Sequence, residues 1–568
     1  MRRLVKVWGF VCSFTALAFA SCTTQRQPPP AEDHATDRPN VLFIIADDLG
    51  FADLGLYGAE VDTPRLDALA ASGVQFTNFH TAATCSPSRA MLLTGVDNHR
   101  NGLGSMREFL TPDQRGAPGY EGFLNDRVLT LAERMSEAGY FTAFSGKWHL
   151  GMAPDQWPAA RGFDRSFSLL EGSGDNWTSV GPAPIVPELT FTRNGVQVDR
   201  PTGFSSALFV DELMSGLAQN EDTDRPFLAV LSFQAVHWPH HAPDDMLEKY
   251  ANAYDEGWDV IRARRHARMV ELGLLDAAGS TRSRDPNVPA WSSLSAERRA
   301  VESRRMAAYA AMTEDMDREV GRVLDALASQ GELEHTLVVF VSDNGPDPSE
   351  PDLAPRAKAW YTAHYGDLSP ANTGRPGSFP SYGPQWAQLG TVQLRHYKGS
   401  SAEGGMRVPF FLSYPARIQG GRRTDAFAFA TDLVPTLLEL TGVSGAASPP
   451  DERFHPIDGR SFVPLLEGER DHIHSDGHVT GYELMTGSAL FEGDLKLSKA
   501  LPPSGDGRWK LFDLKQDPGE LEDLRETAPE TFDRLMARYE RYVEEYGVIH
   551  MDPDFDVFKA LTTAAEDR

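Results

Sequence analysis

The chain has 568 residues, and 54 Lys and Arg against 81 Asp and Glu give it a formal net charge of −27. Nucleic acids and anionic membrane surfaces are polyanions, so this balance argues against either as the main partner. The length allows a large domain and a smaller one. The three cysteines, Cys12, Cys22 and Cys85, are too few for a disulfide framework.

Residues 1–21 predict an export signal. A positively charged start precedes the apolar run 7–20, which is too short for a well-formed spanning helix, and small residues precede Cys22. This end resembles a bacterial lipoprotein cleavage site, with ordinary signal cleavage and an uncleaved anchor helix as the alternatives. Residues 22–38, rich in Pro, Gln and charge, predict a disordered tether. We therefore expect an exported bacterial protein, periplasmic or a membrane-anchored lipoprotein whose only membrane contact is a lipid on Cys22.

The first predicted strand is the apolar run Asn40–Ala46, whose β-branched residues suit a strand buried on both faces of a parallel sheet. Asp47 and Asp48 follow it directly. Ligands of open α/β sheets bind at the carboxyl ends of the strands, so these carboxylates are candidate ligand groups. A helix is predicted over Pro64–Ala70, with Thr63 as its cap.

The segment Thr84–Gly95 contains the only cysteine that is not near the N-terminus. We expect Ser86 to cap a helix with Pro87 in its first turn, which places Cys85 just outside the helix N-terminus and Arg89 one turn inside. Backbone N–H groups and the helix dipole favour negative charge there, so the segment predicts an anion site containing a reactive group. The alternative is that Cys85 is only a small buried hydrophobic residue.

Three further predicted strands also end on polar or ionisable side chains. They are residues 140–145, after a helix over 129–138 and before Lys147 and His149; residues 227–233, before His237; and residues 336–341, after a helix over 304–329 and before Asp343 and Asn344. The alternation of helices and strands predicts an α/β domain with a mainly parallel sheet. Because single Asp pairs and lone histidines are mostly structural, only the whole set is informative.

Two long segments interrupt this alternation. Residues 244–299 are rich in Arg and Glu and predict a solvated helical insertion, because charge runs usually face water. Residues 346–393 are rich in Pro, Gly and aromatic residues such as Trp360 and Trp386. Aromatic residues beside an active-site edge commonly shape a substrate pocket, so this segment is a candidate pocket wall for a planar or apolar group.

The C-terminal part predicts a second, smaller unit. Strand-like segments at 495–497 and 509–513 and an amphipathic helix over 529–546 follow a linker of small residues and proline at 444–450. We expect a catalytic α/β domain at 39–445, a smaller α+β subdomain at 446–550 and a tail at 551–568.

The polar strand ends together predict a metal site. The oxygens of Asp47, Asp48, Asp343 and Asn344 are hard ligands, which suit Ca²⁺ or Mg²⁺ and not Zn²⁺. The available cations are Arg89, Lys147 and Lys398, and the available proton carriers are His149 and His237.

Several of these segments match a known family. Cys85-Ser86-Pro87-Ser88-Arg89 with Leu93-Thr94-Gly95 resembles the first signature of the type I (formylglycine-dependent) sulfatases, and Gly146–Gly151 resembles the second. The likeness continues in the family's order at Asp47-Asp48, His237, Ser342–Gly345, Lys398-Gly399, Gly404–Pro409 and Leu511–Glu520. The surroundings of Cys85 and the run His237-Trp238-Pro239 look most like bacterial arylsulfatases. The resemblance implies an alkaline-phosphatase-like sandwich with a large mainly parallel central sheet and a smaller C-terminal α+β subdomain.

The same resemblance implies a chemistry. Cys85 would be oxidised to formylglycine by a formylglycine-generating or other sulfatase-maturation enzyme. One hydroxyl of its hydrate would attack the sulfur of a sulfate monoester and displace the alcohol, giving a sulfoenzyme. The second hydroxyl would then lose its proton, and the C–O bond would break to release sulfate and restore the aldehyde. The implied metal is Ca²⁺, with Mg²⁺ as the alternative, and its implied ligands are Asp47, Asp48, Cys85, Asp343 and Asn344.

The resemblance also assigns roles to the charged residues. Arg89 and Lys147 would hold the formylglycine oxygens, and His149 would be the base for hemiacetal breakdown. Lys398 and His237 would bind the sulfate and protonate the leaving group, with the choice of acid open between them.

Three functions are weighed. The first is hydrolysis of small aryl or alkyl sulfate esters, with a sulfated polysaccharide as the other substrate class. The second is hydrolysis of phosphonate monoesters or phosphodiesters on the same scaffold. The third is a surface lipoprotein that binds a sulfated polymer without cleaving it.

Overall fold

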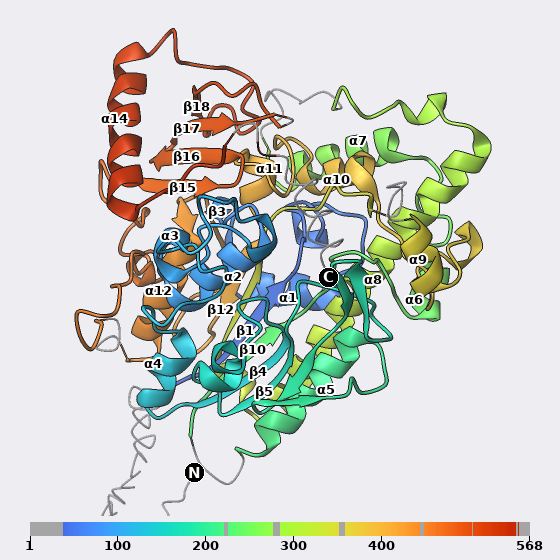
Figure 1. The fold of residues 1–568 in the computed structure, drawn as a ribbon, viewed down its shortest axis with the longest axis horizontal. Helices are drawn as coiled ribbons and strands as arrows, with labels where there is room; N and C mark the ends of the chain where they lie inside the picture. The colour runs from blue at the N-terminus through green and yellow to red at the C-terminus, as the bar shows by residue number, and fades with distance from the viewer. Residues whose placement is uncertain are drawn as a thin grey trace, which may run out of the picture. The chain divides into compact units, whose positions relative to one another are not determined.

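A ten-stranded mixed, mostly parallel sheet forms the centre of the computed structural model (Figure 1). In spatial order its strands are β13 (Arg422–Thr424), β2 (Val74–Phe76), β12 (Phe410–Ser413), β11 (Thr336–Ser342), β1 (Asn40–Ala46), β10 (Phe227–Ser232), β4 (Phe141–Lys147), β5 (Arg165–Leu169), β8 (Phe191–Arg193) and β9 (Val196–Val198). Strands β11, β1, β10, β4 and β5 are mutually parallel, and antiparallel strands flank them on both sides. The predicted α/β class is confirmed.

The structure describes residues 38–220, 225–275, 285–351, 358–443, 448–502, 504–552 and 555. The predicted export signal, with Cys12 and Cys22, lies outside these residues, as does the predicted tether up to residue 37. Among the residues described, no helix is long and apolar enough to cross a membrane.

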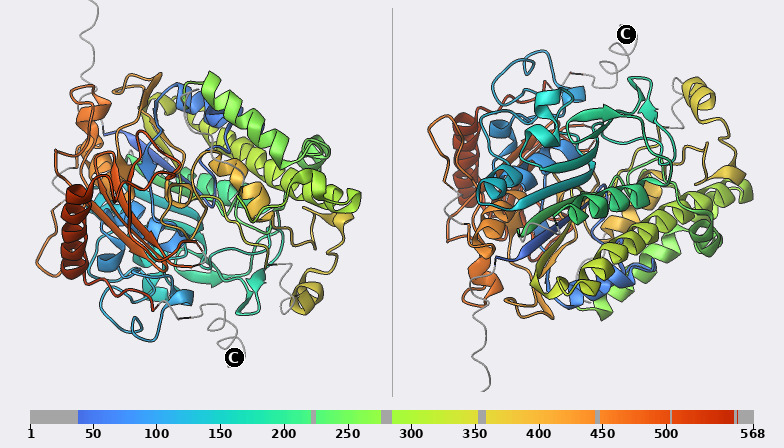
Figure 2. Two further views of the ribbon diagram at one scale, coloured as in Figure 1. Left: turned by 90° about the horizontal axis from the view of Figure 1, so that it is seen from above. Right: turned by 90° about the horizontal axis from the view of Figure 1, so that it is seen from below.

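Strand β1 explains why its sequence is apolar throughout, because both of its faces are covered. Val41, Phe43 and Ile45 lie in one core cluster, and Leu42 and Ile44 lie in the other. The helices on the first side are α2 (Cys85–Thr94), α4 (Leu131–Glu137) and α12 (Leu433–Leu440), and those on the second are α1 (Pro64–Ala71), α5 (Ser205–Ala218) and α8 (Ala296–Ser329). Figure 2 shows these two helical layers with the sheet between them.

The four strands that were predicted to end on polar residues are neighbours in the sheet. The register pairs Ala46 of β1 with Ser342 of β11, and Ile45 with Ser232 of β10. Ser232 is in turn paired with Gly146 of β4. Since all four strands run in the same direction, their carboxyl ends meet at one edge of the sheet.

The charged insertion is helical but is not simply solvated. Its helices are α6 (Asp244–Tyr250) and α7 (Trp258–Glu271), and α7 buries Trp258, Ile261, Arg265 and Met269. The expectation of a solvated segment is therefore wrong for this face, because the sequence pattern does not show which charges find buried partners. The second insertion contains α9 (Lys358–Tyr365) and α10 (Gly383–Thr391).

The C-terminal part is a four-stranded antiparallel sheet covered by one helix. Its elements are β15 (Thr480–Leu484), β16 (Gly487–Glu492), β17 (Leu495–Ala500), β18 (Lys510–Asp513) and α14 (Pro529–Tyr546). Leu490, Leu497 and Leu511 of the sheet pack on Leu535 and Tyr539 of the helix. The amphipathic helix has the bounds that its sequence predicts, while the domain boundary at 445/446 stays a prediction.

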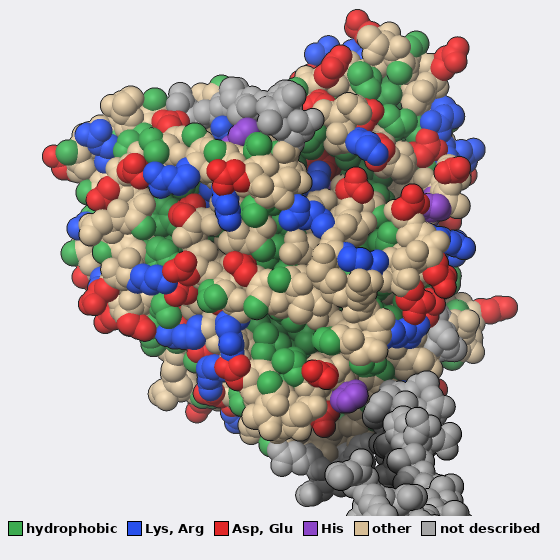
Figure 3. Space-filling view, turned by 180° about the vertical axis from the view of Figure 1, so that it is seen from behind, with side chains coloured by type: hydrophobic (Ala, Val, Ile, Leu, Met, Phe, Trp, Pro, Cys, Tyr) green, Lys and Arg blue, Asp and Glu red, His purple; other side chains and the backbone are tan. Residues whose placement is uncertain are grey.

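Short elements complete the structure. They are β3 (Phe79–His80), paired with β14 (Ala428–Phe429); the hairpin of β6 (Val180–Ala183) and β7 (Val186–Glu188); and the helices α3 (Asn98–Asn101), α11 (Glu403–Met406) and α13 (Val463–Leu466). On the face in Figure 3, the side chains of both charge signs are interspersed among the described residues.

Candidate active site

Cys85 is the first residue of α2, with Thr84 in extended conformation before it. The prediction that Ser86 caps the helix and Cys85 lies outside it is wrong by two residues. No side chain caps this helix, and all ten of its residues are buried, so packing rather than a capping hydroxyl sets its start. The Cys85 side chain nevertheless remains at the N-terminal end, directed toward two carboxylates.

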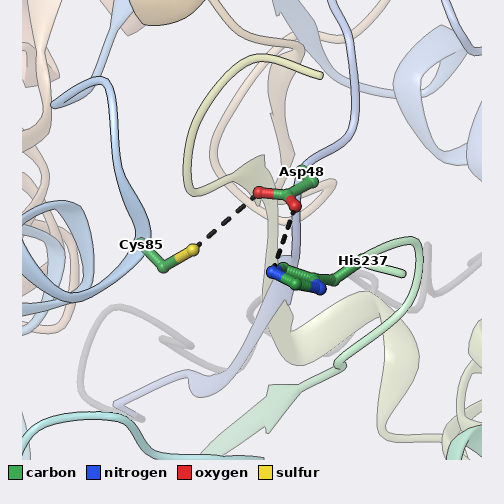
Figure 4. A group of neighbouring side chains, drawn as sticks. All are labelled: Asp48, Cys85 and His237. Carbon is green, nitrogen blue, oxygen red and sulfur yellow. Dashed lines mark hydrogen bonds and ion pairs between the residues drawn. The ribbon is translucent and has the colours of Figure 1, made fainter. Parts of the chain in front are cut away.

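Four acidic or sulfur-containing side chains converge at this edge of the sheet. Ligand atoms of Asp47, Asp48, Cys85 and Asp343 all lie within 4.8 Å of one another. The Cys85 Sγ is 3.4 Å from Asp47 Oδ1 and 3.8 Å from Asp48 Oδ1. In Figure 4, Asp48 lies between Cys85 and His237. The geometry thus brings together residues from the ends of β1 and β11 and the start of α2.

Asn344 completes the donor set. Its Nδ2 donates a hydrogen bond to Asp48 Oδ1 at 2.7 Å, while its buried Oδ1 accepts none from the residues described. Asp48 has a φ of 62°, a costly left-handed conformation that is often found at functional sites. Carboxylate and amide oxygens are the ligands that hard divalent cations prefer, and the Asn344 oxygen has a free lone pair for one. The residues present therefore fit a divalent metal ion.

The carboxylates at this site are crowded and buried. Burial raises the pKa of Asp47 to about 6 and that of Asp48 to about 8, although Lys147 and Lys398 oppose the rise. Burial acts in the same direction on Asp343, but Arg89 and Lys147 outweigh it and hold the pKa of that carboxyl below its usual value. A bound cation would relieve this crowding of negative charge.

Arg89 and Lys147 are held in place by hydrogen bonds and ion pairs with the site. Arg89 Nε donates to Asp343 Oδ2 at 2.7 Å, and its Nη1 donates to the Lys147 carbonyl at 3.0 Å and to Ser232 Oγ at 2.6 Å. Lys147 Nζ lies 2.6 Å from Asp47 Oδ2. Both cations are almost completely buried. The site therefore contains two buried positive charges whose positions are fixed by Asp343 and Asp47.

Lys398 and His237 lie on the side of Asp48. Lys398 Nζ is 2.7 Å from Asp48 Oδ1, and His237 Nε2 is 3.5 Å from Asp48 Oδ2. His237 Nδ1 lies 2.6 Å from the carbonyl oxygen of Trp238. Burial, followed by the charges of Lys398 and Lys147, lowers the pKa of His237 well below its ordinary value, which keeps the imidazole neutral.

His149 follows β4 in a left-handed turn with a φ of 57°. Burial and then the charges of Lys147, Arg89 and Lys398 lower the pKa of His149 well below its ordinary value. Its buried Nδ1 accepts or donates no hydrogen bond among the residues described. The ring lies against Gly172, where a Cβ atom would stand 2.8 Å from His149 Cε1. His149 is thus a neutral base confined beside the three cations.

Burial also raises the pKa of the Cys85 thiol well above its ordinary value, and Lys147 and Lys398 do not offset this effect. A thiol that stays protonated is a poor nucleophile, because the thiolate is the reactive form. The surroundings of Cys85 are therefore unsuited to thiolate catalysis.

Nine of the predicted site residues are joined by direct contacts, and His149 lies close enough for the cations to act on its ring. Sequence reasoning missed Ser232, Trp238 and Asp347 as site residues. Ser232 accepts a hydrogen bond from Arg89. It could have been found in the sequence as the polar residue at the end of an apolar strand. Asp347 forms an ion pair with Lys398 and accepts a hydrogen bond from Trp238, and its only sequence signal is its place three residues after Asn344.

The fold is alkaline-phosphatase-like, and its site combines a donor set for a divalent metal with a group of cations. The family model "Sulfatase" matches residues 39–443, and the model "N-sulphoglucosamine sulphohydrolase, C-terminal" matches residues 397–545. The chain belongs to the sulfatase family, and it is a sulfuric ester hydrolase.

Relatives agree with this assignment. An uncharacterized sulfatase of Schizosaccharomyces pombe is 39% identical over 538 residues, covering 91% of this chain and 96% of its own. An arylsulfatase of Klebsiella aerogenes is 34% identical over 438 residues, covering 76% of this chain and 92% of its own. The crystal structure of Ps i-CgsB in complex with k-i-k-neocarrahexaose has the same fold, with a TM-score of 0.64 and 22% identity over 94% of this chain and 98% of that one.

Proposed function

We propose that this protein hydrolyses small aryl and alkyl sulfate monoesters at residue 85, after Cys85 has been oxidised to formylglycine. The observation that carries the proposal is the surroundings of Cys85. Its side chain lies against two carboxylates and next to buried cations, in a place where the thiol itself stays protonated. Such a site is built to hold an oxygen-based nucleophile and a transferred anion.

Two groups would supply chemistry that the unmodified chain does not have. The formylglycine hydrate would supply the attacking hydroxyl. A Ca²⁺ or Mg²⁺ ion would activate that hydroxyl and neutralise sulfuryl oxygens. The residues that would hold the ion are Asp47, Asp48, residue 85, Asp343 and Asn344.

Arg89 and Lys147 would orient the oxygens on residue 85. Their positions are set by Asp343 and Asp47, which accept hydrogen bonds from them. The transition state of sulfate ester cleavage concentrates negative charge on the leaving oxygen and the sulfuryl oxygens. Prearranged cations stabilise such charge without reorganising during the reaction.

Lys398 is the better candidate for the general acid, on geometric grounds. The Trp238 carbonyl can only accept, so His237 must carry a proton on Nδ1 to make the 2.6 Å contact. In the neutral ring, Nε2 is then an acceptor and has no proton to give. Lys398 Nζ always carries protons as an ammonium, and one of them would pass to the leaving oxygen, a step usually worth about 10²–10⁴-fold in rate.

His149 would accept the proton whose removal frees sulfate. Its Nδ1 is unoccupied by any hydrogen bond among the described residues, and its ring is neutral. Both properties suit a general base.

Other activities have less support. Membership of the sulfatase family disfavours phosphonate or phosphodiester hydrolysis as the main reaction, as well as binding without cleavage. A small apolar alcohol portion is favoured over a sulfated polymer by the aromatic cluster of Trp238, Tyr361, Tyr365 and Phe379.

The test is peptide mass spectrometry across Cys85 in protein co-produced with a sulfatase-maturation enzyme, combined with sulfate release from a panel of esters. We expect the mass of formylglycine and release of sulfate from 4-nitrophenyl sulfate, and neither from Cys85→Ala. An unmodified but fully active Cys85, or faster hydrolysis of an aryl phosphonate than of the aryl sulfate, would contradict the proposal. Faster desulfation of an algal or glycosaminoglycan polysaccharide would overturn the preference for small esters.

We also propose export and lipid attachment at Cys22, on the evidence of the sequence of residues 1–22. Cell fractionation with labelled palmitate provides the test. Label on the wild type and not on Cys22→Ala is expected, and an unlabelled wild type rejects the lipid anchor.

A further inference from the structure

Asp347 is a buried carboxylate that the reaction outlined above does not use. It follows β11, three residues beyond Asn344, and 6% of its surface is exposed. Its Oδ1 accepts from the Ser349 N–H at 2.8 Å, which fixes the carboxylate on its own loop. Its other oxygen, Oδ2, faces two groups of the site.

Those groups are the ammonium of Lys398 and the indole of Trp238. Asp347 Oδ2 lies 3.2 Å from Lys398 Nζ and accepts from Trp238 Nε1 at 3.0 Å. One carboxylate oxygen therefore binds both the cation and the aromatic ring. Burial opposes ionisation of Asp347, but the charge of Lys398 together with the hydrogen bonds from Ser349 and Trp238 holds the pKa of that carboxyl below its usual value.

Trp238 presents an aromatic surface next to the catalytic groups. Its ring is 4.5 Å from that of His237, centroid to centroid, and 5.7 Å from that of Phe379. Phe379 in turn lies 4.2 Å from Tyr361 and 4.7 Å from Tyr365. Trp238 is only partly buried, so it is the member of this cluster that can meet a ligand beside His237.

The two tyrosines are themselves anchored. Tyr361 Oη donates to the Pro182 carbonyl at 3.1 Å, and Tyr365 Oη donates to the Gly181 carbonyl at 2.8 Å. The cluster is thus tied to strand β6 by hydrogen bonds. Trp238 is accordingly supported by packing on one side and by Asp347 at its nitrogen.

We propose that Asp347 is a positioning residue that couples Lys398 to Trp238. It would hold the ammonium of Lys398, which protonates the leaving oxygen, at a fixed position relative to the Trp238 ring, which binds the alcohol portion. The inference deepens the proposed sulfatase function and rests on it. Asp48 also contacts Lys398, but Asp48 belongs to the metal donor set. Asp347 is a contact of Lys398 that lies outside that donor set. The substrate class that this arrangement fits is a sulfate ester with a flat apolar alcohol portion.

The experiment compares kcat and KM for phenyl sulfates whose leaving phenols differ in pKa, in the wild type and in Asp347→Asn, Asp347→Ala and Trp238→Phe. If Asp347 orients the acid, its loss affects poor leaving groups most. We expect Asp347→Ala to lower kcat/KM about 10²-fold for phenyl sulfate and less than about tenfold for 4-nitrophenyl sulfate, the scale of a misplaced general acid. A merely structural loss would lower both rates by the same factor, and that result would overturn the proposal.

A double-mutant cycle tests the coupling itself. Trp238→Phe keeps an aromatic ring but removes the N–H, so it breaks the same contact from the other side. Because the two changes remove one interaction, their effects on phenyl sulfate should be clearly less than multiplicative in the Asp347→Asn, Trp238→Phe double variant. Independent, multiplicative effects would reject the coupling. Asp347→Asn and Trp238→Phe keep side chains of similar shape. The double-mutant cycle can therefore be measured even if the Asp347→Ala variant does not fold.

Asp432→Asn is the matched control, because Asp432 is an equally buried carboxylate that binds the backbone N–H groups of Phe429 and Arg460. It should lower the melting temperature without changing the leaving-group dependence. If the wild type releases no sulfate from any ester, the proposed function fails. If it does so and the Asp347 variants keep the wild-type dependence, only the present inference fails.

Discussion

Glu403 and Lys496 form a fully buried ion pair, with Glu403 Oε1 2.8 Å from Lys496 Nζ. Lys496 belongs to β17 of the C-terminal sheet, and Glu403 begins α11, five residues after Lys398. His80 Nε2 lies 2.9 Å from Glu403 Oε2, and Glu520 Oε1 lies 3.0 Å from Lys496 Nζ. The pair therefore fixes the loop that carries a site cation against the C-terminal sheet.

Removing one partner of this pair should be costly. We expect Lys496→Met to lower the free energy of unfolding by roughly 3–5 kcal/mol, because Glu403 and Glu520 both lose the buried cation that they share. Urea denaturation measures the change. The control is Lys249→Met, which removes the pairs with Asp62 and Glu314 of a lysine whose side chain is 42% exposed; exposed pairs are worth at most about 1 kcal/mol each. Equal losses for the two variants would contradict the importance of burial.

The buried arginine of the charged insertion gives a second prediction. Arg265 Nη1 lies 2.5 Å from Asp53 Oδ1, and Asp53 Oδ2 accepts the N–H of Gly50 just after the metal donor set. Arg265→Met should lower the free energy of unfolding by roughly 3–5 kcal/mol. Arg264→Met, at a neighbouring residue with a side chain 54% exposed, should change it by less than about 1 kcal/mol. The same urea denaturation measures both variants, and an Arg265→Met variant as stable as Arg264→Met would contradict this prediction.

Gly172 provides a test of the role of His149. In Gly172→Ala the new methyl group would stand 2.8 Å from His149 Cε1, so the imidazole must shift. We expect kcat to fall by about 10–10²-fold, the scale of a misplaced catalytic group. In the control, Gly216→Ala, the added atom meets its nearest neighbour at an ordinary 3.6 Å, and activity should not change. An unimpaired Gly172→Ala enzyme would argue against His149 as the base.

His99 should make stability depend on pH above neutrality. Burial opposes protonation, but hydrogen bonds with Asp97 and Glu483 raise the pKa of His99 from 6.5 to about 9. Because the folded pKa lies above the unfolded one, this stabilisation is complete below pH about 6.5 and is lost as pH rises through about 9. It amounts to roughly 3 kcal/mol. Urea denaturation at pH 6 to 10 should show this loss of unfolding free energy in the wild type and a weaker dependence on pH in His99→Gln. Parallel pH dependences in the two proteins would contradict the role of His99.

Metal removal tests the donor set independently of catalysis. Treatment with a chelator should lower the melting temperature, and Ca²⁺ or Mg²⁺ should restore it, since ligand at 100 times its Kd stabilises a protein by about 2.7 kcal/mol. Asn344→Ala removes the buried oxygen that has no hydrogen bond among the described residues, and it should weaken this shift. If neither chelator nor added metal changes the melting temperature of the wild type, the predicted metal site is wrong.

The candidate site was largely predictable because its residues follow local signals. Strands β1, β10 and β11 are mainly apolar and buried, and β4 is buried although it mixes apolar with polar residues. Each of these segments is followed by polar or charged residues. The parallel order of the strands then brings those ends to one edge. The start of α2 was not predictable to the residue, because the burial of the whole helix, and not a capping side chain, decides it.

The amino-acid sequence by itself determined the α/β class, the polar strand ends, the C-terminal helix over Pro529–Tyr546 and the likeness to the sulfatases, because each depends on residues that are close together in the chain. Only the tertiary structure decided that Arg265 is buried and that Asp347 binds both Lys398 and Trp238. A charge becomes a core residue only when a partner distant in sequence is folded against it. Trp238 and Asp347, 109 positions apart, meet because β10 and β11 flank β1 in the same sheet.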